Sequence, residues 1–373
     1  MINFDNAATT GRKPEMVMNA VYNAMRRLSA NPGRGGHRLS LDTAKAVYST
    51  REKIADFFGA SGPDRVVFTS NCTTAINYVL KGFLNHGDRV TTSDLEHNAV
   101  MRPLKKIGAK VSIATVDFTN DDKTVESFEK LMYEDTKMVF CTAASNVCGK
   151  MLPIKKIGGL CKKRGIAFGV DAAQMAGVAP LDMKDMNIDF LCIAPHKGLY
   201  APMGLGVLIA EKEIGDTIIE GGTGTNSLSL YQPQDLPERY ESGTLNVPAI
   251  MGTSAGIDFV KRYAKDAYNE EFKLIKRLYE ELEKMSDIIL YIPYVKEGMY
   301  MPVLSFNIAG IPSEQTALYL DRKGVAARAG LHCAPYAHRR LGTIDTGTVR
   351  IAPSYFSTSA EIDYLIKILK VYK

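Results

Sequence analysis

The segment between residues 65 and 210 alternates short, strand-forming apolar runs with stretches of helical periodicity. Several of the runs are continuous rather than alternating, which is typical of strands buried on both faces of a sheet. Alternation of strands and helices indicates an α/β domain with a mostly parallel sheet. We expect seven strands, at residues 66–68, 89–91, 111–113, 138–140, 167–170, 190–193 and 206–209. Helical segments separate them, for example at residues 73–84 and 154–164.

The C-terminal part of the chain has a different pattern. Residues 255–285 have the periodicity of long helices, a strand-like run follows at 303–306, and Thr358 with Glu361 forms a capping-box signature for a last helix. A chain of 373 residues is too long for one small core and suits two domains. We therefore predict a smaller α+β domain at 250–373, a large α/β domain at 16–249, and an N-terminal segment at 1–15 that joins the small domain.

Composition restricts the kinds of partner. Lys and Arg number 46 against 41 Asp and Glu, giving a net charge of +5, and the charges are dispersed, so no nucleic-acid partner is expected. No apolar stretch reaches 18 residues and the N-terminus lacks a signal-peptide pattern, so no membrane association is expected. The six cysteines form no C-x-x-C pair, which favours a reducing cytoplasm, and no metal site is predicted.

Lys197 and Asp171 are the strongest candidates for chemistry. Each closely follows a predicted strand, and ligands of such sheets bind outside the carboxyl ends of the strands. A lysine in a glycine-rich turn with a strand-end aspartate is the equipment for pyridoxal 5′-phosphate (PLP): the amine forms a Schiff base and the carboxylate pairs with the pyridine nitrogen. The alternatives are a surface lysine and an aspartate that only caps a helix.

Other polar residues fit the same cofactor. Gln174 and Asn146 could reach the phenolic oxygen of the ring, and His97 could stack on the ring and handle protons near it. The segment 71–74 lies between a strand and a helix, where backbone N–H groups bind phosphate. Within it we expect Cys72 and Thr73 to contact the phosphate, with Thr73 the first choice of side chain, and His196 could also donate to it. Helix capping is the alternative role for Thr73.

Cys333 and Arg350 are candidates for contacting the substrate. Cys333 is flanked in sequence by positive or titratable residues that would favour its thiolate, namely Arg328, His332, His338, Arg339 and Arg340. Arg350 stands alone among apolar residues, which suggests bidentate capture of a substrate carboxylate. An internal ion pair is the alternative for Arg350.

Taken together, these motifs resemble the class V, fold-type I PLP-dependent enzymes, and among them the cysteine desulfurase and selenocysteine lyase group. The resemblance covers nearly the whole chain. It is carried by 5–10 (DNAATT), Arg34-Gly35, Glu96-His97, Ser145-Asn146, 171–174 (DAAQ), His196-Lys197, 241–244 (ESGT), Arg328 to Cys333 and Arg350. The resemblance implies a homodimer in which Thr244 reaches the phosphate of the partner subunit, and it places Ala7, Arg34 and Asn146 near the substrate.

The resemblance also implies an activity. L-cysteine would give L-alanine, with the sulfur carried as a persulfide on Cys333 for an acceptor. Release of selenium from L-selenocysteine, a class V aminotransferase activity and a non-catalytic scaffold remain alternatives. The short connection from Arg328 to Cys333 resembles the branch with an ordered cysteine loop. Ala194 and Cys72 replace hydroxyl residues that are common in relatives, so two side-chain donors to phosphate are missing.

Overall fold

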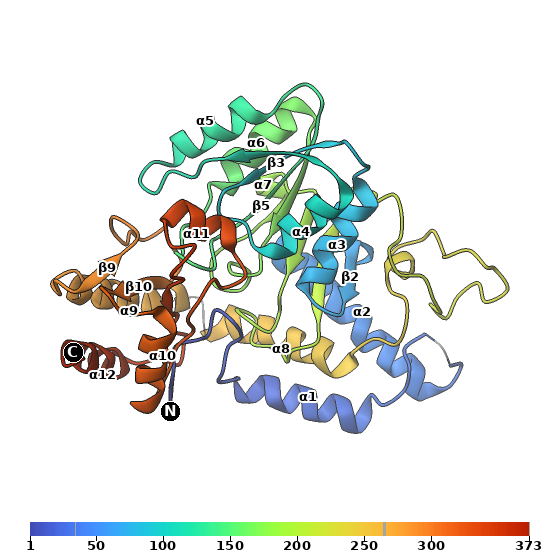
Figure 1. The fold of residues 1–373 in the computed structure, drawn as a ribbon. Coiled ribbons are helices and arrows are strands. Elements are labelled where there is room, and N and C mark those ends of the chain that lie inside the picture. Colours follow the sequence, from blue (N-terminus) through green and yellow to red (C-terminus); the bar gives the residue numbers. More distant parts are fainter. Residues whose placement is uncertain (34, 264–265, 373) are drawn as a thin grey trace.

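The computed structural model describes residues 1–33, 35–263 and 266–372. A seven-stranded sheet forms its centre, in the order β2-β8-β7-β6-β5-β3-β4 (Figure 1). All seven predicted strands are present: β2 (Val66–Thr69), β3 (Arg89–Ser93), β4 (Lys110–Ala114), β5 (Thr136–Thr142), β6 (Ala167–Asp171), β7 (Phe190–Ile193) and β8 (Gly206–Ala210).

The sheet is mostly parallel, as predicted, with one reversed strand. Strand β8 runs antiparallel to both of its neighbours, β2 and β7. A parallel connection would need a crossover that carries the chain back past the sheet, usually through a helix. The segment between β7 and β8 instead turns back at the same edge, with positive φ angles at Tyr200 and Gly204. This reversal places Lys197 in a turn at the carboxyl end of β7.

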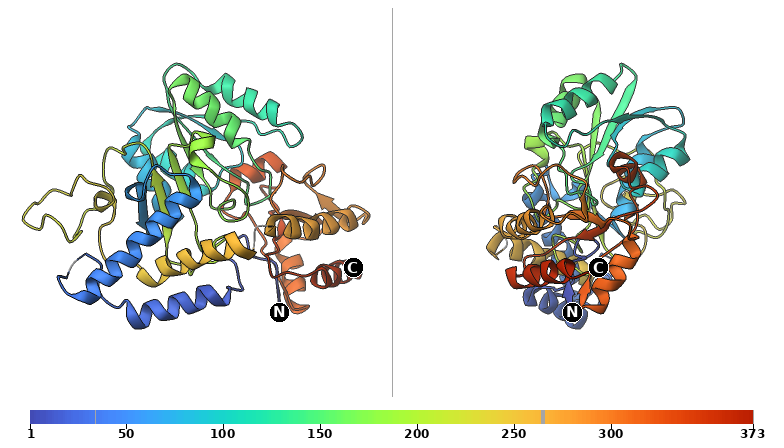
Figure 2. Two further views of the ribbon diagram at one scale, coloured as in Figure 1. Left: turned by 180° about the vertical axis from the view of Figure 1, so that it is seen from behind. Right: turned by 60° about the vertical axis from the view of Figure 1, so that its left-hand side comes forward.

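Helices cover both faces of the sheet and connect its strands (Figure 2). Helix α3 (Cys72–Phe83) begins one residue before its predicted start, and α6 (Ile154–Arg164) has the predicted limits. The other connecting helices are α4 (Asn98–Ile107), α5 (Asp121–Leu131) and α7 (Met183–Met186). Because α3 and α4 follow strands that point the same way, both helices begin at the carboxyl edge of the sheet.

Three further helices pack together beside the sheet. Helices α1 (Glu15–Arg27) and α8 (Val247–Tyr263) lie below it in Figure 1, and α2 (Arg38–Phe58) lies at its right-hand side. Short 3₁₀ turns occur at Pro63–Arg65 and Glu238–Tyr240. The segment 211–246 connects β8 to α8, and its middle part extends away from the rest of the molecule, whereas Ile214 and Tyr240 near its ends are buried. Its side chains Leu228, Leu230 and Tyr231 are exposed.

The C-terminal part is built from α9 (Ala267–Leu282) and a three-stranded antiparallel sheet with the order β12-β10-β9. These strands are β9 (Ile288–Leu290), β10 (Leu304–Ile308) and β12 (Val349–Ile351). The remaining helices are α10 (Ser313–Arg322), α11 (Pro335–Leu341) and α12 (Ser359–Lys370). The predicted capping box is confirmed: Thr358 and Glu361 exchange side-chain and backbone hydrogen bonds at the start of α12.

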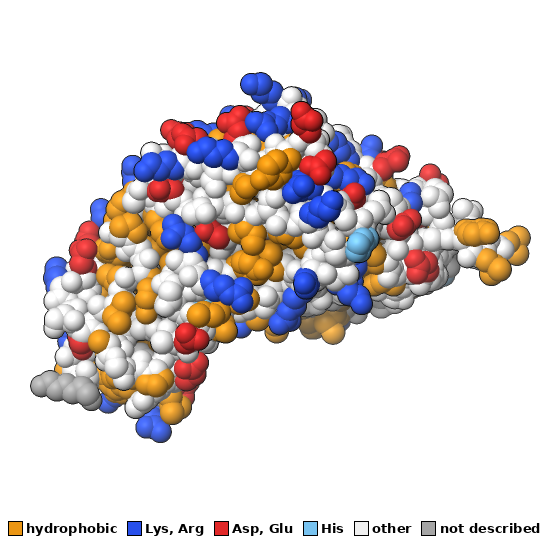
Figure 3. All heavy atoms as spheres, turned by 45° about the horizontal axis from the view of Figure 1, so that its top comes forward, with side chains coloured by type: hydrophobic (Ala, Val, Ile, Leu, Met, Phe, Trp, Pro, Cys, Tyr) orange, Lys and Arg blue, Asp and Glu red, His pale blue; other side chains and the backbone are white. Residues whose placement is uncertain are grey.

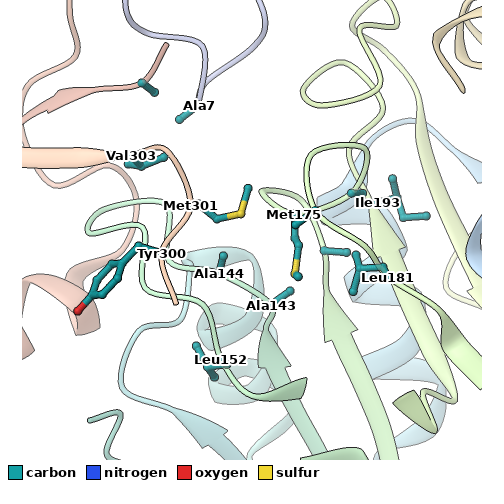
Figure 4. Packing of buried hydrophobic residues seen from close by; sticks show 14 of the residues in the cluster. Ala7, Ala143, Ala144, Leu152, Met175, Leu181, Ile193, Tyr300, Met301 and Val303 are labelled. Atoms are coloured by element: carbon teal, nitrogen blue, oxygen red, sulfur yellow. The ribbon is translucent and has the colours of Figure 1, made fainter. Parts of the chain in front are cut away.

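The N-terminal strand β1 (Ile2–Asn3) pairs in parallel with β11 (Val325–Ala326). One apolar cluster then continues from this segment into the rest of the molecule. Figure 4 shows Ala7 facing Met301 and Val303 of the C-terminal part, with Met175 and Ala144 of the large sheet's loops nearby. The predicted domain boundaries after residues 15 and 249 stay a prediction. The second of them lies within α8, which begins at Val247.

The surface carries both signs of charge. Figure 3 shows Lys and Arg side chains distributed over the face in view, with Asp and Glu among them and apolar atoms between. Of the helices in the described ranges, none combines the length and apolar character needed to cross a bilayer.

Candidate active site

A cavity opens at the carboxyl ends of the parallel strands. Eight of the residues singled out in the sequence line it together: Cys72, Thr73, His97, Asn146, Asp171, Gln174, His196 and Lys197. They come from five strand ends, so the sheet brings together side chains that are as much as 125 positions apart, from Cys72 to Lys197.

Asp171 is the last residue of β6 and is 4 % exposed. Its Oδ1 accepts a hydrogen bond from the Ala173 N–H (2.9 Å) and a weak one from the Cys72 thiol (3.8 Å). The chain therefore holds one carboxylate oxygen in place. Because Asp171 also lines the cavity, the carboxylate is oriented by its own neighbours before any ligand binds.

Lys197 lies four residues after β7, with its side chain half-buried. Burial lowers the pKa of its amine, and the neighbouring Asp171 and Cys72 partly oppose that shift. A lysine with a lowered pKa has a larger fraction in the neutral, nucleophilic form.

The N-terminal segment holds the peptide group between His196 and Lys197 by hydrogen bonds. The carbonyl oxygen of His196 accepts hydrogen bonds from Thr9 Oγ1 (3.1 Å), Thr10 Oγ1 (3.1 Å) and Lys13 Nζ (3.0 Å). Burial lowers the pKa of Lys13 to about 8. Contacts from a segment nearly 190 positions away thus fix the turn that carries Lys197.

Two histidines face the cavity in neutral form. His97 caps α4 by accepting the Ala99 N–H at Nδ1 (3.0 Å), so the neutral ring carries its proton on Nε2. Burial lowers the pKa of His97, although Asp171 opposes the shift. Burial, with Lys197 and Lys13 nearby, lowers the pKa of His196 to about 4, and its Nδ1 is buried without a hydrogen-bond partner among the described residues.

Glu96 lies beneath the cavity and is fully buried. Its carboxyl group accepts hydrogen bonds from the Ser93 hydroxyl and from the Thr142 N–H (3.0 Å). Burial raises its pKa to about 8, and the charge of Asp171 adds to that shift. Glu96 therefore ties β3 to β5 below the site as a largely protonated acid at neutral pH.

The start of α3 lines one side of the cavity. Asn71 caps the helix through the Thr74 N–H (2.9 Å), leaving the first-turn N–H groups directed outward. A Cβ atom on Gly206 would lie 2.2 Å from the carbonyl carbon of Asn71. A glycine is therefore required where β8 passes the start of α3.

Cys333 is exposed and lies in a neighbouring groove rather than in the cavity itself. His97, Thr73 and Ala99 line both spaces, so the two are contiguous. The loop that carries the thiol is held by its carbonyl groups: Asn146 Nδ2 donates to the His332 oxygen (2.8 Å), and the Asn98 N–H donates to the Cys333 oxygen (2.7 Å).

The positive surroundings predicted for Cys333 are weaker than the sequence suggested. His332 is buried against the Thr348 carbonyl (3.1 Å), and burial with nearby Arg350 lowers its pKa to about 2. Burial also lowers the pKa of His338. Arg340 is paired with Asp94 (3.2 Å). Arg328 and Arg339 are the arginines of this group that form no ion pair with any residue in the described ranges.

Arg350 is 1 % exposed and forms an internal ion pair. Its Nη2 donates to Asp5 Oδ1 (2.8 Å) and its Nη1 to the Asn146 carbonyl (2.9 Å), while Nε is buried without a partner among the described residues. Arg350 does not line the cavity. The alternative weighed for it from sequence, an ion pair, is therefore present, and capture of a carboxylate stays a prediction.

The other expected substrate and cofactor contacts are placed differently. Ala7 lies beside the site, since its carbonyl accepts from Gln174 Nε2 (3.1 Å). Thr244 is exposed and does not line the cavity of its own chain, so its expected role still requires a second chain. Arg34 lies outside the described residues.

Residues 2–365 match the aminotransferase class-V family. This chain belongs to that family. The class-V match confirms the resemblance drawn from the motifs, and it includes the cavity, the Lys197 turn and the Cys333 loop.

Among curated class-V relatives, a probable cysteine desulfurase of Pyrococcus abyssi is 32% identical over 99% of this chain and 94% of its own. A probable cysteine desulfurase of Synechocystis is 30% identical over 99% and 90%. The apo cysteine desulfurase of Thermococcus onnurineus has a TM-score of 0.90 at 31% identity and covers 99% of this chain and 94% of that one.

Class-V enzymes depend on PLP, and the residues of this cavity fit that cofactor. An amine of lowered pKa and an oriented carboxylate face one space. The unpartnered Nδ1 of His196 and the outward N–H groups of α3 provide donors for a phosphate. These donors offset the hydroxyls missing at Ala194 and Cys72.

The sequence did not single out Lys13, Glu96 or Asp5 individually. Glu96 and Asp5 appear only as neighbours of recognised motif residues, and Lys13 is a single charge just beyond the DNAATT segment. The only available signal was proximity to those motifs, because each acts through contacts with residues distant in sequence.

Proposed function

We propose that this chain is a PLP-dependent cysteine desulfurase that converts L-cysteine to L-alanine and carries the sulfur as a persulfide on Cys333. The observation that carries the proposal is that the cavity and the Cys333 groove are contiguous. Lys197 and Asp171 line one, the exposed Cys333 lines the other, and His97 lines both. The two curated relatives, both probable cysteine desulfurases, support the same reaction.

PLP would be held by Lys197, Asp171, Gln174, His196 and the N-terminal turn of α3. When bound, PLP supplies an acceptor for the electron pair released at the α-carbon of the substrate. The lowered pKa of Lys197 suits its Nζ to take up the α-proton. The Asp171 carboxylate, held by the Ala173 N–H, would keep the pyridine nitrogen protonated.

Sulfur transfer needs a thiolate beside the bound substrate. Cys333 Sγ forms a bond to the substrate sulfur and the Cβ–S bond breaks. Its electron pair stays on Cβ, which takes up a proton and becomes the methyl group of alanine. His97 lies between the two spaces, and the proton on its Nε2 is available at this boundary.

The direct test is turnover of the purified, PLP-loaded chain with L-cysteine and, in parallel, L-selenocysteine. We expect alanine from L-cysteine and a persulfide on Cys333 detected by mass spectrometry. Cys333→Ala should abolish persulfide formation, whereas Cys161→Ala, at a buried site on α6, should keep it. Absence of alanine from both substrates would refute the proposal, and alanine from selenocysteine alone would replace it with the lyase.

We further propose that the active form is a homodimer. Thr244 lies near the end of the segment 211–246, is exposed and does not line the cavity of its own chain. The exposed Leu228, Leu230 and Tyr231 of that segment are suited to packing on a second copy. Sedimentation equilibrium should give about twice the chain mass of 41.0 kDa. A monomer that retains full turnover would refute it.

A further inference from the structure

The groove that contains Cys333 extends away from the cofactor cavity and is lined by residues of α3 and α4. Two rows of side chains with a spacing of four residues line it. Helix α3 contributes Thr73, Asn77 and Lys81, and helix α4 contributes Asn98, Arg102 and Lys106. Residues four apart share one face of a helix, so each row forms one wall.

Each row begins at the thiol and ends in positive charge. His97 caps α4 and the Asn98 N–H donates to the Cys333 carbonyl, so the thiol lies at the start of α4. Lys81 and Lys106 lie eight residues after Thr73 and Asn98. Neither helix contains an Asp or a Glu. Within the described ranges, Lys81, Arg102 and Lys106 form no ion pair, and all three side chains are exposed. The groove is thus a cationic channel that leads to the sulfur.

The thiol is fixed at the end of this channel. His332 and Cys333 both have positive φ angles, 47° and 58°, a backbone conformation that residues other than glycine rarely adopt. Hydrogen bonds from Asn146 and Asn98 hold the two carbonyl groups in that arrangement. A loop held in this way does not carry its sulfur outward, so an acceptor must bring its own thiol into the groove.

We infer, on the basis of the proposed desulfurase activity, that the groove binds an acidic segment of a thiol-bearing acceptor protein. Eight helical residues span about 12 Å, which corresponds to about four residues of extended chain. The acceptor therefore carries Asp or Glu within about four positions of its reactive cysteine. The acceptor thiolate attacks the outer sulfur of the Cys333 persulfide, a new S–S bond forms, and Cys333 leaves as the thiolate.

The test uses two synthetic peptides with one cysteine each, flanked by Asp and Glu in one and by Lys in the other. Cys333 is first loaded with L-cysteine, excess substrate is removed, and persulfide transfer is followed by mass spectrometry. Each rate is divided by the rate of the same peptide with a small uncharged disulfide, because flanking charge changes thiol reactivity. Dithiothreitol serves as an uncharged acceptor.

At low ionic strength we expect the acidic peptide to react at least about tenfold faster than the basic one, the minimum effect of electrostatic steering. Arg102→Gln with Lys106→Gln should remove most of this preference and leave transfer to dithiothreitol unchanged. Lys162→Gln with Lys163→Gln removes the same charge from the exposed side of α6 and should preserve the preference.

Equal rates for the two peptides on a fully loaded Cys333 would overturn the inference and leave the desulfurase activity intact. A change of oligomeric state in the Arg102/Lys106 variant would also overturn it, because a second copy of the chain would then cover the groove. Failure to load Cys333 at all would overturn the proposed function and this inference with it.

Discussion

Replacing Asp5 by alanine should destabilise the protein strongly through Arg350. The guanidinium is 1 % exposed, and Asp5 is its ion-pair partner at 2.8 Å. Removing one member of a buried pair costs about 3–5 kcal/mol, because the remaining charge is uncompensated. The Asp5 side chain is 32 % exposed, so water can partly replace it, and we expect a value near the lower limit.

The unfolding entropy of a chain of 373 residues is about 0.8 kcal/mol/K, so a loss of about 3 kcal/mol corresponds to a fall in melting temperature of roughly 4 °C. Thermal unfolding of the PLP-loaded chain at fixed PLP concentration measures this fall. Asp185→Ala is the matched control, because it breaks an ion pair with Lys155 whose side chains are 52 % and 65 % exposed. Exposed ion pairs contribute about 0–1 kcal/mol to the free energy of unfolding, so the melting temperature of this control should change little.

The same variant tests whether Arg350 captures a carboxylate. In Asp5→Ala the carboxylate of L-alanine is the available counter-ion, so saturating L-alanine should raise the melting temperature more than it does in the wild type. L-alaninamide, which lacks that charge, should not. A melting temperature within about 1 °C of the Asp185 control would refute the assignment of Asp5 as the compensating charge.

Two further predictions concern Glu96 and the contact of Gly206 with the start of α3. The pKa of Glu96, raised to about 8 by burial, exceeds the value of about 4.3 in an unfolded chain. The folded state then binds the proton more tightly, so the stability contributed by protonated Glu96 is complete below about pH 4 and is lost as the pH rises through 8. The urea midpoint of Glu96→Gln should fall less between pH 5 and 8 than that of the wild type, and an unchanged slope would contradict this. Gly206→Ala should weaken PLP binding at least about tenfold in an absorbance titration, because a Cβ 2.2 Å from the Asn71 carbonyl carbon must displace the start of α3. Gly159→Ala, on α6 with no atom within 4 Å, is the control, and equal PLP affinity in both variants would refute the argument.

Much of the fold could be predicted because its signals are local. The seven strands were identifiable from continuous apolar runs, α6 has the predicted limits, and the capping box of Thr358 and Glu361 requires only four consecutive residues. Cavity residues were predictable for a related reason. Each polar candidate follows a strand, and a parallel sheet brings its carboxyl strand ends to one edge.

Charge states and pairings were not predictable in the same way. The sequence around Cys333 suggested a cluster of positive charge, yet burial keeps His332 neutral and Asp94 neutralises Arg340. A titratable side chain takes its charge from its burial and neighbours, and neither is a property of the local sequence.

The amino-acid sequence by itself determined the element types, the family and eight of the residues that line the cavity, since periodicity, caps and local motifs act over a few positions. Only the tertiary structure decided that β8 reverses, that Asp5 pairs with Arg350 at 345 positions' separation, and that α3 and α4 align their cations beside Cys333. These features depend on which distant surfaces are packed together, and the free energy of that packing is summed over the whole chain.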